Sequence, residues 1–248
     1  MLMRVERITK EFRVEGGTLK VLDDVDFSVD EGVFLSIVGP SGCGKSTLLK
    51  IMGGIERPTS GRIIFKGREI KSPDPKISMV FQHFALIPWL TVWEQVELPL
   101  KARGIDKRRR EKLVKKWLKK VGLYEFMDAL PKELSGGMKQ RVGIARALAV
   151  EPDLLLMDEP FSALDELTAD SLREEILELW KSETQVKSVV MVTHNVEEAV
   201  YMSDYVVVLS RRPSKILGIV EIDLRRPRDT RSSEFYNKMD EVYSVLSG

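Results

Sequence analysis

One stretch of the sequence decides the fold class, Gly39-Pro40-Ser41-Gly42-Cys43-Gly44-Lys45-Ser46, which fits G-x-x-x-x-G-K-[ST] at every fixed position. An apolar run, Val33–Val38, precedes it and is typical of a buried strand, and a helical pattern follows to Met52. Glycines let backbone N–H groups approach phosphate oxygens, and the helix start favours the same anion. This pattern predicts a phosphate loop in which Lys45 reaches the β- and γ-phosphates and Ser46 holds Mg²⁺. The residues expected to contact the phosphates are Gly39, Pro40, Ser41, Gly42, Cys43, Gly44, Lys45, Ser46 and Thr47.

Outward from this loop, strand and helix signals alternate along the chain. Arg4–Phe12 and Leu19–Val29 read as strands, and Gly16-Gly17 between them predicts a hairpin. Helical spacing dominates from Thr91 to Val150. Alternating strands and helices predict an α/β fold with a parallel sheet. The remaining strand candidates are Gly61–Phe65, Ile77–Phe81, Leu154–Met157, Ser188–Thr193, Tyr205–Leu209 and Ile216–Ile222.

Two acids, Asp158 and Glu159, end the apolar stretch that begins at Leu154. Parallel α/β sheets bind ligands beyond the carboxyl ends of their strands, so both acids are expected at the rim that also holds the phosphate loop. Because successive strand residues point opposite ways, we expect the acids to have different tasks. Asp158 orients Mg²⁺ through its water, and Glu159 polarises the attacking water.

Composition narrows the protein class. The 248 residues contain one cysteine, Cys43, so no internal disulfide can form and a reducing compartment is favoured. No stretch approaches 18 uninterrupted apolar residues, and Met1–Lys10 lacks a signal-peptide run. The 39 basic and 38 acidic residues nearly cancel, which argues against a nucleic-acid partner. We therefore expect a soluble, cytosolic globular protein.

A basic stretch, Lys101–Lys120, contains eleven lysines and arginines against the two acids Asp106 and Glu111. It could bind phosphates of lipid or nucleic acid, or it could be the solvated face of an amphipathic helix. The second interpretation is favoured, because apolar residues recur there at helical spacing. These residues are Leu113, Trp117, Leu118 and Val121.

The segment Asn237–Asp240 fits N-K-x-D, the guanine-reading pattern of GTPases. It does not follow a strand, and the chain has no D-x-x-G. The surrounding apolar residues have helical spacing, so a packing helix is predicted instead. They are Phe235, Met239, Val242 and Leu246.

The segment Leu134–Arg141 (LSGGMKQR) precedes a helical run and the carboxylate strand. Ser135 is a predicted N-cap, and the glycines after it expose N–H groups at a helix start, which makes a second anion-binding end. Here the sequence resembles the ATP-binding subunits of ABC transporters. The segment is similar to their signature motif LSGGQ, with Met138 where glutamine is commoner.

The resemblance covers nearly the whole chain, with the motifs in the family's order. Phe12 stands where the family places an aromatic residue that stacks on adenine, and Gln82 matches the glutamine of the Q-loop. Further along the chain, Ser162–Asp165 match the D-loop and His194 matches the switch histidine. The resemblance implies three sets of site residues. The catalytic set is Lys45, Gln82, Glu159 and His194; the metal set is Ser46, Gln82 and Asp158; and the nucleotide-binding set adds Phe12, Gln82, Asp158, Ser135, Gly136 and Gly137 to the phosphate loop.

The implied fold is a P-loop, RecA-like parallel-sheet core with an N-terminal antiparallel β subdomain and an inserted helical lobe. Residues 1–248 then form a single ABC ATPase domain. The sheet core with its β subdomain takes about 1–89 and 153–222, the helical lobe about 90–152, and a helical tail about 223–248.

The resemblance also implies partners. Two such subunits, here a homodimer, face head to tail and sandwich two ATP molecules with Mg²⁺, so that Ser135 and Gly137 of one chain close the site of the other. The dimer powers import through a separate membrane permease, served indirectly by an extracytoplasmic solute-binding protein. The chain is then cytoplasmic and peripheral on the inner face of the cell membrane. Three features resemble those of the ATP-binding subunits of importers for nitrate, taurine and alkanesulfonates. They are the segment Pro88–Val92, the methionine Met138 and the segment Pro227–Asp229.

Three alternatives remain open at this level. One is a soluble ABC-type ATPase that acts on DNA or ribosomes, but no coiled-coil arm or duplicated ATPase domain is visible. Another is a non-catalytic nucleotide-binding subunit, against which Lys45, Glu159 and His194 argue. The third is an ATPase subunit of a different class of ABC transporter.

Overall fold

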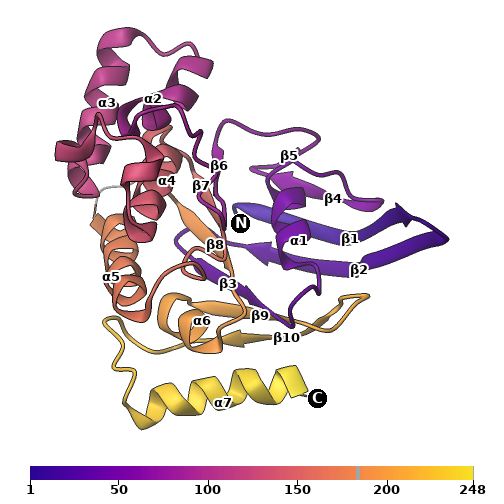
Figure 1. Ribbon diagram of the computed structural model, residues 1–248. Helices are drawn as coiled ribbons and strands as arrows, with labels where there is room; N and C mark the ends of the chain where they lie inside the picture. Colours follow the sequence, from indigo (N-terminus) through magenta and orange to yellow (C-terminus); the bar gives the residue numbers. More distant parts are fainter. Residues whose placement is uncertain (183–184, 248) are drawn as a thin grey trace. The chain divides into compact units, whose positions relative to one another are not determined.

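The computed structural model describes residues 1–182 and 185–247, and it divides into two compact units. The first unit comprises Met1–Asp74 and Lys187–Gly248, and the second comprises Pro75–Val186. Figure 1 shows the elements of both. The boundaries predicted for a helical lobe, about 90–152, remain a prediction.

The first unit contains an antiparallel sheet of four strands in the order β2-β1-β4-β5. Its two long strands, β1 and β2, pair from Met3 opposite Val29 to Val14 opposite Gly17, which confirms the predicted hairpin. Apolar side chains such as Val5 and Ile8 are fully buried. The bounds are β1 (Met3–Val14), β2 (Gly17–Val29), β4 (Ser60–Phe65) and β5 (Arg68–Glu69).

The same unit contains parallel strands that lead to the predicted loop. β3 (Phe34–Val38) pairs in parallel with β8 (Ser188–Val192) and with β9 (Tyr205–Leu209), and β10 (Ile216–Glu221) is antiparallel to β9. Every residue of β3 and β8 is buried, as continuous apolar strands covered on both faces require. The helices of this unit are α1 (Lys45–Met52), α6 (Val196–Met202) and α7 (Ser233–Ser247).

Helix α7 packs along β10 and α6 (Figure 1). Its residues Phe235 and Val242 are buried in one cluster with Val200 of α6, and Met239 and Leu246 pack against that cluster. The N-K-x-D segment therefore lies in a packing helix, as predicted.

The second unit pairs β6 (Ile77–Val80) in parallel with β7 (Leu154–Asp158). Between these strands in the sequence come three helices that pack against one another, α2 (Val92–Ala102), α3 (Lys107–Lys120) and α4 (Gly136–Ala149). Short 3-10 turns at Tyr124–Phe126 and Pro131–Glu133 connect α3 to α4, and α5 (Glu166–Ser182) follows β7.

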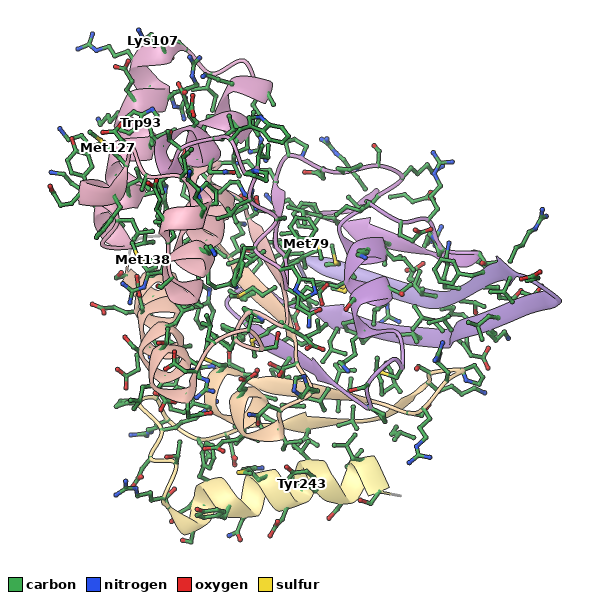
Figure 2. All side chains as sticks on the ribbon, in the orientation of Figure 1. Met79, Trp93, Lys107, Met127, Met138 and Tyr243 are labelled. Atoms are coloured by element: carbon green, nitrogen blue, oxygen red, sulfur yellow. The ribbon has the colours of Figure 1, made fainter. Side chains whose placement is uncertain are left out.

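Helix α3 confirms the amphipathic interpretation of the basic stretch. It buries Leu113, Val114, Trp117 and Leu118, while Lys107 at its start projects into solvent (Figure 2). Two cations of the stretch pair with one acid of α2, since Glu97 accepts from Arg110 Nε at 3.0 Å and lies 2.7 Å from Lys101 Nζ. Burial alone would raise the pKa of Glu97, but its hydrogen bonds to Lys101 and Arg110 lower it.

Within residues 1–182 and 185–247, none of the helices has both the length and the apolar character that a bilayer crossing requires.

Candidate active site

The predicted phosphate loop runs from the end of β3 to the start of α1 in the first unit. Gly44, the residue before α1, has φ 115°, which disfavours any side chain, and a Cβ on it would lie 2.6 Å from Val21 Cγ1. The loop therefore closes tightly against β2, and its shape depends on glycine at this position.

Lys45 places a buried positive charge inside the loop. Its side chain is only 4% exposed, and its Nζ donates to Gly39 O at 2.8 Å and Pro40 O at 3.1 Å. The ammonium is thus held at the start of the loop by the carbonyl oxygens of its first two residues. This donor set fits a polyphosphate, which needs a compact cation and convergent N–H groups. Cys43 is buried, as a packing residue would be, and its carbonyl accepts from Ser214 Oγ.

His194 comes two residues after the end of β8 and is exposed. It lines a cleft of about 450 Å³ together with Gly39 and Pro40, the first residues of the phosphate loop. Tyr243 and Leu246 of α7 line the same cleft. The structure therefore brings the predicted switch histidine to the beginning of the phosphate loop.

Phe12 lies near the end of β1, half-buried, and pairs with Leu19 across the hairpin. Lys10 Nζ stands 4.7 Å from the centroid of its ring. That ammonium is fixed by Glu56 Oε1 at 2.6 Å and by Arg57 O at 2.7 Å. Phe12 is thus an ordered aromatic side chain with a cation held beside it.

In the second unit, β7 ends at Asp158, which is 5% exposed, and Glu159 leaves the strand. Glu159 has φ 43°, in the left-handed region. The prediction that strand alternation sets the directions of both acids is therefore wrong for Glu159. Its direction follows from the turn and from the contacts that hold it.

Gln82 contacts Glu159 directly. The Gln82 Nε2 donates to Glu159 Oε2 at 3.1 Å and lies 3.4 Å from Ser162 Oγ. Ser162 Oγ in turn donates to the Glu159 carbonyl oxygen at 3.1 Å. The structure thus joins the amide, the carboxylate and the predicted D-loop in one hydrogen-bonded group, which spacing along the sequence did not predict.

The signature segment caps helix α4. Ser135 Oγ accepts from Met138 N at 3.2 Å, which confirms the predicted N-cap. Figure 2 labels Met138 in this first turn. A Cβ on Gly137 would lie 2.6 Å from Thr168 Cγ2 of α5, so glycine is needed for this close approach. The signature segment and the helix after the D-loop therefore pack together.

The D-loop ends at Asp165, which caps α5. Asp165 Oδ1 accepts from Thr168 N at 3.0 Å, and Oδ2 accepts from Thr168 Oγ1 at 2.7 Å. Hydrogen bonds from the Thr168 hydroxyl and backbone hold the pKa of Asp165 below its usual value. These hydrogen bonds favour the charged form of the carboxylate and join the end of the D-loop to the first turn of α5.

Arg146 is a residue that the motifs did not reveal. From α4 its guanidinium donates to Ala85 O at 2.6 Å and to Phe84 O at 2.8 Å. Phe84 and Ala85 have φ 60° and 47°, so this segment after Gln82 is held in an unusual left-handed conformation. Burial lowers the pKa of Arg146. No sequence spacing links Arg146 to this segment.

The predicted site residues thus divide between the units. Phe12, Gly39–Thr47 and His194 lie in the first, whereas Gln82, Ser135–Gly137 and Asp158-Glu159 lie in the second. In the part of the chain that the structure describes, no group of three or more His, Cys, Asp or Glu side chains could hold a metal ion.

Comparison with known proteins identifies relatives of the chain. The ABC transporter family profile matches residues 22–162. An uncharacterised ABC transporter ATP-binding protein of Methanocaldococcus jannaschii is 48% identical over 244 residues, 98% of this chain and 91% of that protein. The aliphatic sulfonates import ATP-binding protein SsuB of Bacillus cereus is 42% identical over 95% of this chain and 92% of its own length.

Two further comparisons extend this finding. The bicarbonate transport ATP-binding protein CmpC of Synechococcus elongatus is 45% identical over the whole of this chain, which spans 38% of that protein. A dimeric ATP-binding cassette solved in a post-hydrolysis state with ADP and phosphate matches with a TM-score of 0.80 and 33% identity, over 90% of this chain and all of that one. This structural match confirms the predicted P-loop α/β fold class.

Proposed function

The chain belongs to the ABC transporter family of ATP-hydrolysing cassettes, and on that premise we propose that it powers solute import through a separate membrane permease. One observation carries the proposal. The signature segment packs against the helix after the D-loop, and in the same unit Gln82 donates to the carboxylate of Glu159. A phosphate loop alone is shared by many ATPases, whereas this combination is typical of ABC-type ATPases, and the import and transport functions named for two relatives favour a transport role.

We assign nucleotide binding to the first unit. Lys45 and the backbone of Gly39–Thr47 bind the phosphates of ATP, and Phe12 stacks on the adenine. The buried Lys45 ammonium, which donates to the carbonyl oxygen of the first loop residue, Gly39, supports this role. Bound ATP supplies the phosphoryl group whose transfer to water releases free energy.

We assign proton chemistry to Glu159. Its carboxylate accepts a proton from the attacking water, and Gln82, in contact at 3.1 Å, holds that carboxylate in place. His194 acts as the switch residue that senses the terminal phosphate. We propose Ser46, Gln82 and Asp158 as the residues that hold Mg²⁺, because a hydroxyl, an amide and a carboxylate are the oxygen ligands that this ion prefers.

We further propose that the whole chain acts as one ATPase domain that pairs head to tail with a second copy. The partner's Ser135, Gly136 and Gly137 then close the nucleotide site with N–H and O–H donors. The capped start of α4, which presents such donors, supports this assignment. Closing and opening of the dimer transmit the free energy of hydrolysis.

The segment Phe84–Trp89 is proposed as the permease contact. The guanidinium of Arg146 holds the start of this segment by donating to Phe84 O. Further along, Gln95 Oε1 accepts from the Ile87 N–H at 3.2 Å, and Gln95 Nε2 donates to the Ile87 carbonyl oxygen at 2.6 Å. Trp89, at the end of the segment, is 75% exposed. An anchored segment that ends in an exposed aromatic suits a protein partner. Binding there would place the chain on the inner face of the cell membrane.

For the solute we propose a small oxyanion or sulfonate, delivered by an extracytoplasmic solute-binding protein. The support is the import of aliphatic sulfonates and the transport of bicarbonate that the names of two relatives state. The test is to purify the chain with its permease and to measure ATP turnover against a panel of such solutes. A chain that co-purifies with no membrane protein would instead favour a soluble ATPase.

Replacing Lys45 by alanine should weaken ATP binding about tenfold to a hundredfold, since a charge-assisted contact is worth about 1.5–3 kcal/mol. Calorimetric titration measures the affinity. Lys50→Ala, on the exposed face of the same helix, is the control and should bind as the wild type does. Equal affinity of Lys45→Ala and wild type would refute the phosphate-binding role.

Replacing Phe12 by alanine should also weaken ATP binding, by an amount matching about 1–3 kcal/mol of base stacking. A ring offers no hydrogen bond to the base, so GTP should bind within roughly tenfold of ATP. Leu19→Ala, opposite Phe12 in the hairpin, is the matched control. If Phe12→Ala binds ATP unchanged, another aromatic stacks on the base.

A further inference from the structure

Two arginines that follow β10, Arg226 and Arg228, bind the C-terminal end of helix α6. Arg228 is 7% exposed, and the two N–H groups of its Nη1 are shared among three carbonyl oxygens at this end, two of them at 2.6 and 3.0 Å. Arg226 donates to a fourth carbonyl oxygen through Nη2. The acceptors are the carbonyl oxygens of Val200, Tyr201, Met202 and Ser203.

These contacts stabilise the C-terminal end of the helix. The last carbonyls of a helix have no intrahelical donor, and a cation there also suits the helix dipole. Burial lowers the pKa of Arg228 to about 10, so the guanidinium remains charged at neutral pH. Arg228 also donates to Leu224 O at 3.1 Å and to Ile222 O at 3.2 Å. It therefore joins the end of α6 to the chain after β10.

The other end of α6 is tied to both neighbours of His194. Thr193 Oγ1 donates to Glu198 Oε2 at 2.6 Å and accepts from Asn195 N at 3.0 Å. Asn195 Oδ1 accepts from Glu197 N at 2.9 Å and from Glu198 N at 3.3 Å. The backbone at His194 is thus fixed to the first turn of the helix.

Helix α6 is short enough to act as a rigid link between these two ends. Its seven residues span about 10 Å. Its buried residues Val196, Ala199 and Val200 pack in one cluster with α7. Tyr243 of α7, labelled in Figure 2, lines the same cleft as His194. A displacement at the C-terminal end of α6 would therefore move His194.

We propose that Arg228, assisted by Arg226, is a positioning residue that sets the place of His194 through helix α6 and thereby the rate of ATP hydrolysis. This inference rests on the proposed switch function of His194. It makes the segment after β10 part of the hydrolytic machinery, although none of its residues carries a nucleotide-binding motif.

The first test reads the histidine itself and needs no activity. The chain has only two histidines, His83 in the second unit and His194 in the first, so ring signals of the ¹⁵N-histidine-labelled full chain are few. Arg228→Lys keeps the charge but cannot make the forked set of bonds. It should shift or broaden the His194 ring signals and leave those of His83 unchanged. Val25→Ala, a buried change in β2, is the control for lowered stability and should affect neither.

The second test reads catalysis in the full chain. Arg228→Lys should lower kcat about tenfold, since misplacing a group by about 1 Å has effects of this size or larger. ATP affinity should change less than about twofold, because the phosphate loop is untouched. In a His194→Ala background, Arg228→Lys should have no further effect, since the two residues act in series. If Arg228→Lys lowers kcat by the same factor in the His194→Ala background as in the wild type, Arg228 does not act through His194 and serves only the stability of the fold.

Arg226→Lys should give a weaker version of both effects, because Arg226 contacts the Met202 carbonyl whereas Arg228 contacts those of Val200, Tyr201 and Ser203. If the Arg228→Lys chain does not fold, both measurements are made on the Arg226→Lys chain instead. Unchanged His194 signals in a folded arginine variant overturn the inference, whatever the hydrolysis rate. A wild-type chain that binds but does not hydrolyse ATP contradicts the proposed function instead, while the histidine signals still decide the inference.

Discussion

Replacing Glu159 by glutamine should lower ATP turnover by about a hundredfold to ten-thousandfold, the range that a general base contributes. The change keeps the size of the side chain, and its amide oxygen can still accept from Gln82 Nε2, which contacts this carboxylate at 3.1 Å. What is lost is the ability to take a proton from water. ATP binding should be unaffected, because the phosphate loop is unchanged.

The same variant should accumulate as an ATP-bound dimer, which size-exclusion chromatography with and without ATP can detect. Glu174→Gln, on the exposed face of α5 in the same unit, is the matched control and should turn over normally. A Glu159→Gln chain that hydrolyses ATP at the wild-type rate would exclude this carboxylate as the base.

Replacing Ser135 by arginine should abolish turnover and leave ATP binding to the single chain nearly intact. The proposed reason is that Ser135 serves the nucleotide of the other chain, so a bulky cation there blocks closure of the dimer. Loss of the cap to Met138 N also costs about 1 kcal/mol of stability. Asp106→Arg controls for that loss, because Asp106 caps α3 in the same unit. It should remain active.

Complementation makes this prediction specific to a site shared between chains. Mixing Ser135→Arg with Lys45→Ala gives mixed dimers with one fully intact site and one that carries both defects. An equal mixture should recover roughly a quarter of the wild-type rate, since about half of the two-fold dimers are mixed and each has one working site of two. Wild-type turnover per chain that stays constant far below the concentration needed for dimers would refute the shared site.

Local features of the fold could be predicted from the sequence. The buried strand before the phosphate loop, the N-terminal hairpin and the capped start of α4 each depend on residues within a few positions of one another. Ser135 and Met138 are three apart, and Val14 pairs with Gly17. Periodicity and capping preferences act over such distances, so the sequence alone reveals them.

Contacts between distant residues could not be predicted in this way. Arg146 binds carbonyls 61 and 62 positions away, and Arg228 binds carbonyls as far as 28 positions away. A backbone carbonyl has no sequence signature, so nothing in the chain marks it as the acceptor of a particular guanidinium. Gln82 and Glu159, 77 positions apart, were both predicted site residues, yet only packing shows that they touch.

The left-handed backbone of Glu159, φ 43°, has a consequence for how this chain can evolve. Such a conformation costs roughly 1–2 kcal/mol for residues other than glycine. A mutation to glycine would relieve that strain and would also remove the carboxylate, so the more stable sequence is the inactive one. At this position, selection for ATP hydrolysis opposes selection for a higher free energy of unfolding. A lineage that no longer needed transport would therefore be expected to drift toward glycine here, and a long acidic side chain kept in this conformation is a mark of selection for chemistry.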